Sequence, residues 1–530
     1  MEQMNRRDFL ALSGTVASGM AAGLWIKGGS ALASVGESVA DDRYGLVVLV
    51  DGWRADLFAE MLEGGELPNI KEHLVDRGTM VEHCVGAFPS TTGPAHLPFL
   101  TGTLPGRNDV PGVRWVDRKE NNLRDYCTLE GLLINKDYSL GAATLYEFLA
   151  GHKTLSIFEI VSRGAFEAVR IAAKVVWWIR SDELWEKFDE AAVEVAEDRY
   201  LRTNDPPRFT FVWMPGMDHL AHFHGSVSET VREEARNIDG HIGRIAEVLK
   251  KCRIYDKTLF ALVSDHGLRD NEQSRDPRDI LEDLDFDVKP SVAKKDVWND
   301  LRNYNAARAV SGNGFAHVYV AKRTGGHWPL GYNDWEHTPD YNDLRNFPLK
   351  GRGHIDLVEA FREEEAIRLV CVKEEPGRYL VFSGNGQATI ERQSSTYKYT
   401  VEGEDPLGYS AHPHTKGLMD GAFHSANEWL RASCTAQYPD GVVQISQLFD
   451  SRRCGDIVLS SMPGWDLMKE GHIASHGGLE KEEMVVPVVL AGPGIAHKRM
   501  QYARTVDVFP TYLRFFGLPK IDGQTMDIFG

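Results

Sequence analysis

The sequence predicts an α/β fold whose core is a doubly wound, mostly parallel sheet, with an inserted α+β cap. Four short, largely apolar runs support this prediction, at residues 46–50, 209–214, 258–263 and 485–490. Such runs are typical of strands that are buried on both faces, as in a parallel sheet covered by helices. Helical patterns lie between them, at residues 183–200 and 229–250. This alternation of strands and helices indicates a doubly wound sheet.

A different pattern interrupts the core. Residues 270–295 are strongly charged, and four runs of alternating polarity follow, at 366–372, 378–382, 388–392 and 397–401, joined by glycine-rich or polar turns. Alternation of this kind indicates antiparallel strands. We therefore expect an inserted cap at 271–454 and a core formed by 34–270 and 455–530. The segment 312–322 is a candidate to return to the core sheet.

Composition excludes several classes of protein. Hydrophobic residues make up 42% of the chain and charged residues 26%, so a disordered chain, a collagen-like fibre and a multi-span membrane protein are excluded. The net charge of −18 argues against a nucleic acid polymer as partner. It does not argue against a small phosphate ester, because a bound metal ion can dominate the local field. The six cysteines are too sparse for a disulfide scaffold, although one or two bridges remain open.

The first 33 residues are interpreted as an export signal. Residues 5–10 (Asn-Arg-Arg-Asp-Phe-Leu) place two arginines before a mildly apolar stretch, and residues 31–33 (Ala-Leu-Ala) provide a cleavage site. The arginine pair resembles the twin-arginine signal of bacteria, which a receptor reads. The alternative is a single membrane anchor, but an anchor needs about 20 strongly apolar residues. We expect twin-arginine export, a periplasmic or secreted protein, and no stable membrane anchor.

Candidate ligands for a metal ion lie mostly at the ends of the predicted strands. In chain order they are Asp51, Thr92, Asp218, His222, Asp265, His266 and His476. Carboxylates and imidazoles are the ligands that zinc uses when thiolates are absent. An aspartate and a histidine four residues apart share one face of a helix, and ligands of α/β sheets bind at the carboxyl ends of the strands. Singly, each could be a helix cap or a turn residue. Together they predict a metal site.

The order of these motifs resembles the type I phosphodiesterase/nucleotide pyrophosphatase branch of the alkaline phosphatase superfamily. The resemblance covers roughly residues 45–270 and 455–530 and leaves out the cap. It implies two divalent metal ions, usually zinc. One would be bound by Asp218, His222 and His476, and the other by Asp51, Asp265, His266 and the hydroxyl of Thr92. It also implies that Thr92 is the nucleophile and forms a phospho-threonine intermediate, which a water molecule then hydrolyses.

The family pattern selects the nucleophile among three neighbouring hydroxyls. It sets a proline two residues and a histidine four residues after the nucleophile, and Pro94 and His96 satisfy both only for Thr92. Thr91 and Ser90 remain alternatives. His96 is expected to pack behind the site or to contact a metal ligand, rather than to bind a metal itself.

Two departures from the family pattern leave the substrate open. Ala95 stands where many members have an asparagine, and residues 112–117 lack the asparagine of some related phosphatases. Arg114 lies in that segment, and its guanidinium could hold a phosphoryl oxygen. The alternative is a surface arginine, and Arg163 is a weaker candidate for the same role. The preference between monoester and diester therefore stays open.

Other residues are weaker candidates. Trp177 and Trp178 could stack on a base, although a core helix face is the better interpretation because their neighbours are aliphatic. Several histidines lie near the motifs or in the cap without the expected spacing: His219, His224, His412, His414 and His472. His354 and His424 are expected to be solvent-exposed or packing residues.

The sequence therefore predicts an exported two-metal hydrolase of small phosphate esters, a phosphodiesterase or nucleotide pyrophosphatase. A phosphomonoesterase or phosphonate hydrolase on the same core is the closest alternative. A sulfatase is disfavoured because His96 replaces the arginine of the usual sulfatase signature. The alternative from another class is a secreted binding protein that has lost catalysis.

Overall fold

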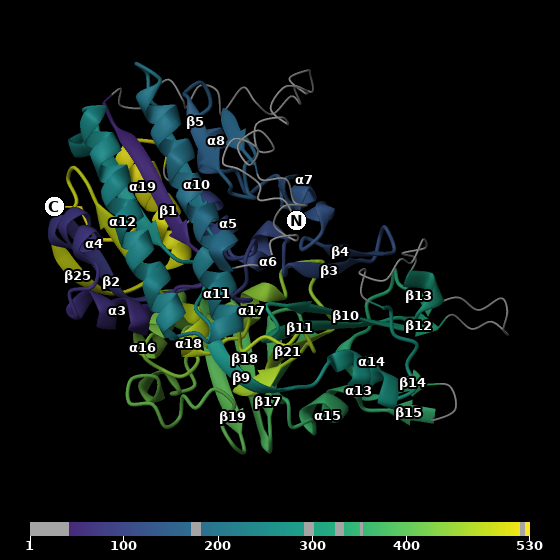
Figure 1. Ribbon diagram of the computed structural model, residues 1–530. Helices are drawn as coiled ribbons and strands as arrows, with labels where there is room; N and C mark the ends of the chain where they lie inside the picture. The colour runs from purple at the N-terminus through teal and green to yellow at the C-terminus, as the bar shows by residue number, and fades with distance from the viewer. Residues whose placement is uncertain are drawn as a thin grey trace.

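The computed structural model describes residues 42–170, 182–290, 301–323, 333–349, 353–519 and 525–529. The expected signal at 1–33 and the pair Trp177-Trp178 lie outside the described residues. Figure 1 shows a core of helices and strands beside a second, largely β region formed by the middle of the chain.

The core is an eight-stranded, mostly parallel sheet, as predicted. Its strands lie in the order β25 (Lys498–Arg504), β2 (Gly78–Val85), β24 (Val485–Ala491), β8 (Thr258–Val263), β1 (Tyr44–Val50), β7 (Phe209–Met214), β5 (Thr154–Ile157) and β6 (Glu167–Val169). Only β24 is antiparallel to its neighbours. The four apolar runs correspond to β1, β7, β8 and β24, which are almost wholly buried, because helices cover both faces of the sheet.

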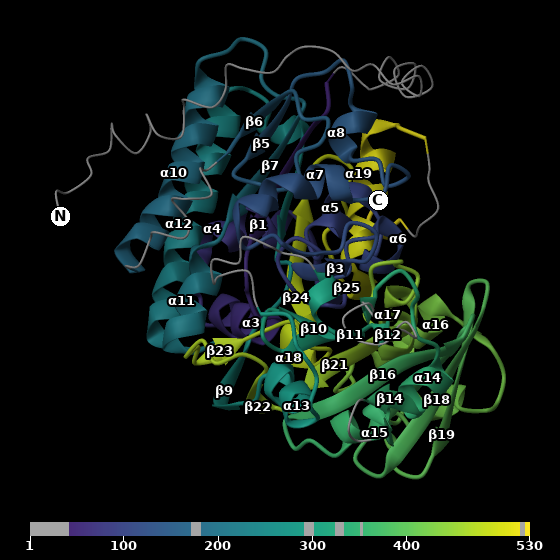
Figure 2. The same ribbon diagram turned by 90° about the vertical axis from the view of Figure 1, so that its right-hand side faces the viewer.

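Helices lie on both sides of this sheet (Figure 2). Helices α10 (Asp182–Leu201) and α12 (Glu229–Lys251) cover one side, and α5 (Leu97–Thr101) and α19 (Val508–Phe516) cover the other. Helix α12 begins where the hydroxyl of Ser228 accepts a hydrogen bond from the backbone N–H of Val231. Its buried side chains recur every three or four residues, from Val231 to Leu249, and so form one apolar face toward the core.

The second sheet is entirely antiparallel and also has eight strands. Their order is β10 (Ala306–Ser311), β11 (Phe315–Val320), β21 (Ile457–Ser461), β16 (Ile367–Glu375), β17 (Arg378–Ser383), β18 (Gly386–Gln393), β19 (Thr396–Glu402) and β20 (His424–Ser425). Strands β16 to β19 confirm that the four runs of alternating polarity form antiparallel strands.

Two strands of this sheet differ from expectation. The segment 312–322 does not return to the core sheet, because β11 pairs with β10 and β21. Strand β21 comes from the segment expected to be core, yet it completes the second sheet. The short turn between β10 and β11 explains the first difference, since a tight hairpin keeps its second strand in the same sheet. The domain boundaries at 271 and 454 stay a prediction.

The cap and the core share buried surface. Helices α16 (Ala426–Ser433) and α17 (Gly441–Leu448) lie between the second sheet and the core (Figure 2). The side-chain amide of Gln447 donates to the backbone oxygen of Phe88, and its oxygen accepts from Gly106 N–H. Phe88 belongs to the same hydrophobic cluster as residues of α17. This packing fixes the loop that carries Thr92 against the cap.

A small three-stranded sheet completes the frame of the site. Strand β9 (Arg269–Ser274) follows β8 and pairs with β22 (Gly464–Asp466) and β23 (Ala474–Ser475). This pairing brings residue 476 beside the end of β8.

In the described part of the chain no helix combines the length and apolarity that crossing a bilayer requires. All six cysteines are free.

Candidate active site

Two neighbouring core strands carry the first group of site residues. Asp51 follows β1, and Asp265 and His266 follow β8, which is paired with β1 in parallel. Parallel neighbours end at the same edge, so these side chains meet there. The Nε2 atom of His266 lies 3.3 Å from Oδ1 of Asp51 and 3.3 Å from Oδ2 of Asp265. All three residues are buried.

The second group lies beside the first and is carried by α11 (Gly216–His224), the helix that follows β7. Asp218 and His222 lie one turn apart on this helix, as predicted, with Nε2 of His222 at 3.4 Å from Oδ2 of Asp218. His476 arrives from the loop after β23, and its Nε2 lies 3.7 Å from Oδ1 of Asp218. The rings of His266 and His476 are stacked with centroids 3.7 Å apart, so the two groups adjoin.

The histidines are oriented by the backbone. Their Nδ1 atoms lie at hydrogen-bond distance from carbonyl oxygens: 2.7 Å to Ala474 for His222, 2.9 Å to Ser90 for His476 and 3.1 Å to Gly267 for His266. Each Nδ1 donates, so each Nε2 turns its lone pair toward a carboxylate. Two acceptors facing each other are unfavourable without a cation or a proton between them. This is the orientation of a histidine that binds a metal ion.

Thr92 lies against the first group. Its Oγ1 is 3.4 Å from each carboxylate oxygen of Asp51 and 3.3 Å from Nε2 of His266. The neighbouring hydroxyl of Ser90 is fully buried and donates to the backbone oxygen of Gly478. The structure therefore brings the hydroxyl of Thr92, and not that of Ser90, to the cluster.

The site concentrates negative charge in a buried place. Burial and the nearby carboxylates of Asp265 and Asp218 raise the pKa of Asp51 to about 6. Oδ1 of Asp218 is buried and, among the described residues, has no hydrogen-bond partner. Both features indicate that a positive charge belongs here.

Among the residues that the structure describes, two sets could hold a cation: Asp51, Asp265 and His266, and Asp218, His266 and His476. Within each set the ligand atoms lie within 4.8 Å of one another. Oxygen and imidazole donors without thiolates suit zinc and other divalent ions. The residues present therefore fit a divalent metal ion, and His266 adjoins both sets rather than one.

A cavity of about 300 Å³ opens beside Thr92. Asp51, Thr92 and Asp218 lie at its polar end. Apolar and aromatic side chains form much of the remaining wall: Tyr126, Phe158, Ile160, Trp185 and Trp213. The ring of His219 stacks on that of Trp185 with centroids 4.4 Å apart. This wall is suited to a planar or apolar group attached to a phosphate.

Comparison with known proteins identifies the family. The family model described as type I phosphodiesterase/nucleotide pyrophosphatase matches residues 46–485. The chain belongs to this family. The resemblance inferred from the motifs is thereby confirmed.

Members of the family with curated names are distant relatives. Human ectonucleotide pyrophosphatase/phosphodiesterase family member 1 is 23% identical over 223 residues, which are 42% of this chain and 23% of that protein. An uncharacterised pyrophosphatase/phosphodiesterase of Schizosaccharomyces pombe is 23% identical over 265 residues, 48% of this chain and 50% of that protein. The alignments thus span half or less of these relatives' own length.

Solved structures of the family share the fold. Murine ectonucleotide pyrophosphatase/phosphodiesterase 5, an inactive threonine-to-alanine variant in complex with AMP, superimposes with a TM-score of 0.55 at 13% identity. The match covers 92% of this chain and 100% of that one. The human counterpart has a TM-score of 0.54, also at 13% identity, and covers 91% of this chain and 97% of its own.

Arg114, which the sequence predicts to bind a phosphoryl oxygen, donates hydrogen bonds to other groups of the protein. It lies on β3 (Arg114–Asp117), where Nε donates to Asp125 Oδ2 at 3.0 Å and Nη1 donates to the Val310 carbonyl at 3.1 Å. Its neighbours Val113 and Tyr126 line the cavity beside Thr92, but Arg114 does not. Its catalytic role stays a prediction. Arg163 is held by Glu147 and by the carbonyl of Ala142, which indicates a structural role.

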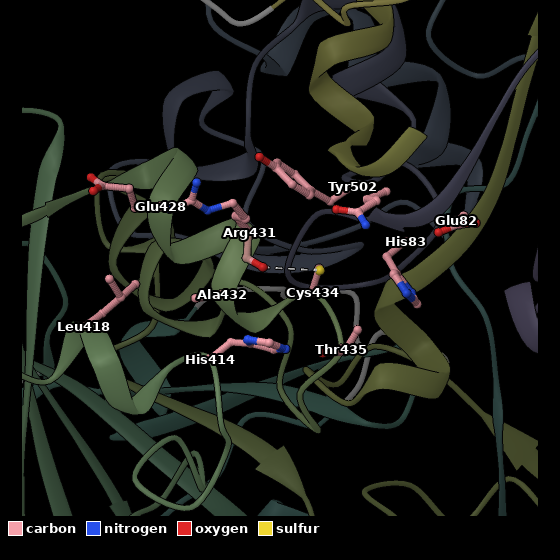
Figure 3. Close-up of a pocket in the computed structure, with 11 residues that line it drawn as sticks. Glu82, His83, His414, Leu418, Glu428, Arg431, Ala432, Cys434, Thr435 and Tyr502 are labelled. Atoms are coloured by element: carbon pink, nitrogen blue, oxygen red, sulfur yellow. Dashed lines mark hydrogen bonds between the residues drawn. The ribbon is translucent and has the colours of Figure 1, made fainter. Parts of the chain in front are cut away.

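The weaker histidine candidates are scattered. His219 lines the cavity, and the ring of His472 lies 4.4 Å from that of His222. His414 instead lines a second cavity of about 410 Å³ between β2, β25 and the cap. Figure 3 shows His83 and Tyr502 of the core on one side of that cavity, and Arg431 and His414 of the cap on the other. None of the predicted metal ligands lines it, so the candidate active site is the cavity beside Thr92.

Two polar partners of the site were missed from the sequence. The indole Nε1 of Trp213 donates to Oδ2 of Asp51 at 2.8 Å, and Glu159 binds His96 behind the ligands. Nothing in the sequence assigned Trp213 to the site, because this residue belongs to an apolar strand. Glu159 did carry one: it is the only charged residue between Leu155 and Ile160, and a charge in an apolar run is rarely buried without a partner.

Proposed function

We propose that the protein is an exported, two-metal phosphodiesterase or nucleotide pyrophosphatase that acts through a phospho-Thr92 intermediate. The observation that carries the proposal is the hydroxyl of Thr92, which lies 3.3–3.4 Å from Asp51 and His266 at the polar end of a largely apolar cavity. Family membership supports it. So does the murine relative, which is inactive when a threonine is replaced by alanine.

The proposed metal sites use the seven residues predicted from the sequence. Asp218, His222 and His476 would hold one ion. Asp51, Asp265 and His266 would hold the other, next to Thr92. Divalent ions at these places would favour the ionised hydroxyl and offset the charge of the phosphoryl oxygens. Zinc is the expected metal.

The chemistry of this chain's own residues follows from that arrangement. Oγ1 of Thr92 forms a bond to phosphorus while the bond from phosphorus to the leaving oxygen breaks, and the leaving group takes up a proton from solvent. Nε2 of His266, at 3.3 Å, and the two carboxylate oxygens of Asp51, at 3.4 Å, are the acceptors nearest to the hydroxyl of Thr92. Water then attacks phospho-Thr92, releases the phosphate product and restores the hydroxyl.

The cavity supports a leaving group or ester substituent that is planar or apolar. Trp185, stacked on His219, and Phe158 offer flat, apolar surfaces beside the polar end. The murine relative is in complex with AMP, which carries such a group. The cavity accommodates such a group on a monoester or on a diester, so the phosphodiesterase assignment rests on family membership, and a phosphomonoesterase is the second candidate. A phosphonate hydrolase remains compatible, because a phosphonate can carry the same substituent. Seven converging ligands argue against a binding protein that has lost catalysis.

Export is proposed from the first 33 residues alone. The paired arginines, the mildly apolar stretch and the small residues at 31–33 support passage through the twin-arginine machinery to the periplasm or the medium. Lysine substitution of Arg6 and Arg7 should leave the protein in the cytoplasm. Fractionation of a bacterial host that has this pathway would test this.

The catalytic proposal is tested by comparing nitrophenyl esters on metal-replete protein. We expect kcat/KM to be highest for a nitrophenyl nucleotide diester, lower for nitrophenyl phenylphosphonate and lowest for nitrophenyl phosphate. Thr92→Ala should lower kcat by at least about 10³-fold while still binding two metal equivalents, as expected when a nucleophile is removed. Thr92→Ser, which keeps the hydroxyl, is the matched control. Hydrolysis by the alanine variant at the wild-type rate would refute the mechanism.

A further inference from the structure

Behind the proposed metal ligands lies a buried pair of side chains to which the mechanism assigns no role. His96 and Glu159 are both almost completely buried. Nδ1 of His96 lies 2.9 Å from Oε2 and 3.1 Å from Oε1 of Glu159. Glu159 is in turn anchored by the backbone, because its Oε1 accepts the N–H of Val161 at 2.8 Å.

The other ring nitrogen of His96 faces the metal ligands. Its Nε2 lies 3.2 Å from Oδ2 of Asp265 and 3.7 Å from Oδ2 of Asp51. Oδ1 of Asp265 accepts the N–H of Gly52 at 3.3 Å. Both oxygens of Asp265 therefore have a donor, and one of these donors is His96.

A histidine between carboxylates at both ring nitrogens carries a hydrogen on each nitrogen. It then donates to both sides, and the charge of Glu159 holds the ring in place. If Glu159 is neutral, the ring loses the partner that keeps Nε2–H directed at Asp265. The carboxylate of Asp265 can then rotate out of the orientation in which it would bind a cation.

We infer that Glu159 is a positioning residue: acting through His96, it fixes the carboxylates of Asp265 and Asp51 for the cation that binds beside Thr92. The inference rests on the proposed function, because it assumes that these carboxylates bind a metal ion. Partners of this kind behind metal ligands typically change metal affinity by about 10-fold to 100-fold. Glu159 acts from 63 residues away along the chain and would bind neither metal nor phosphate.

Glu159 also lines the cavity, so its charge could instead act on the substrate. Measurements of metal affinity without substrate separate these two roles. A matched control is Glu130, a partly buried glutamate in the segment whose residues Thr128 and Gly131 line the same cavity. Glu130 accepts a hydrogen bond from the backbone of Asp125 and does not contact His96.

The experiment titrates zinc into the metal-free protein in the presence of a competing chelator, for wild type, Glu159→Gln and Glu130→Gln. We expect Glu159→Gln to lower the affinity for one of the two ions by about 10-fold to 100-fold and to leave the other unchanged. Glu130→Gln should match the wild type for both. Excess zinc should restore kcat of Glu159→Gln with KM near the wild-type value.

Wild-type affinity for both ions in Glu159→Gln would overturn the inference, as would a loss of kcat/KM that excess zinc does not correct. If wild type itself binds no ion, the proposed function fails and the inference fails with it, which is a distinguishable result. The melting temperature of each variant reports folding. If Glu159→Gln does not fold, Glu159→Asp keeps the charge but shortens the side chain, and it should show a smaller loss of the same affinity. Unchanged affinity there would overturn the inference.

Discussion

The hydrogen bond from Trp213 to Asp51 predicts a pH-dependent loss of metal affinity. The indole N–H lies 2.8 Å from Oδ2, and both residues are buried. Trp213→Phe keeps most of the ring and its packing but removes this donor. The carboxylate of Asp51, whose pKa burial already raises to about 6, would lose one of the few groups that stabilise its charge.

The size of the effect follows from the strength of the bond. A buried hydrogen bond to a charged group contributes about 1.5–3 kcal/mol, which corresponds to a further rise of about 1 to 2 pKa units. A proton then competes with the metal ion over a wider pH range. With a pKa near 6 in wild type and about 7–8 in the variant, the apparent affinity at pH 6 should fall by about 5-fold to 50-fold. At pH 9 both forms are ionised, and the difference should vanish.

The assay is the apparent dissociation constant for zinc, measured by chelator competition at pH 6 and pH 9. Trp53→Phe is the control, because the indole N–H of Trp53 is buried and has no hydrogen-bond partner among the described residues. Removing the indole N–H of Trp53 should leave the dissociation constant for zinc unchanged at both pH values. Equal affinities of Trp213→Phe and wild type at pH 6 would refute the reasoning. An equal loss at both pH values would show that the bond orients Asp51 rather than stabilising its charge.

Three further predictions concern the frame of the site and the stability of the protein. A Cβ at Gly312, whose φ is +63°, would lie 2.5 Å from Nδ1 of His476, so Gly312→Ala should displace that ring and lower the affinity for one zinc ion by about 10-fold or more, as a zinc titration would show. Burial raises the pKa of Glu480 to about 7, so its carboxyl group keeps a proton in the folded protein at pH values where it would be ionised in the unfolded chain. The free energy of unfolding should therefore fall by up to about 3 kcal/mol as pH rises from about 4.5 to 7, and Glu480→Gln should flatten this part of a plot of Tm against pH. Both oxygens of buried Asp440 bind Arg504 at 2.6 Å, so Asp440→Asn should cost about 3–5 kcal/mol in urea unfolding, and a cost below 1 kcal/mol would contradict a structural role for this pair.

Much of the site could be predicted from the sequence because its parts follow a rule of the fold. Asp51 and Asp265 come after apolar runs, and parallel strands place such residues at one edge of the sheet. The spacing of Asp218 and His222 by four residues fixes their relation on α11 without tertiary information. The place of His476 followed from the resemblance to the family, and its approach to Asp218 became visible only through β23.

The sequence by itself indicated four core strands, four strands of the second sheet and two long helices, since apolar runs, alternating polarity and helical periodicity are local, and it predicted which side chains form the candidate site. The tertiary structure decided which sheet each strand joined: β24 runs antiparallel in the core, and β11 and β21 belong to the second sheet. It also decided the partners behind the ligands, His96 with Glu159 and Trp213 with Asp51, which are 63 and 162 residues apart. Local patterns carry no information about such separations, because these contacts depend on how the chain packs and not on its spacing.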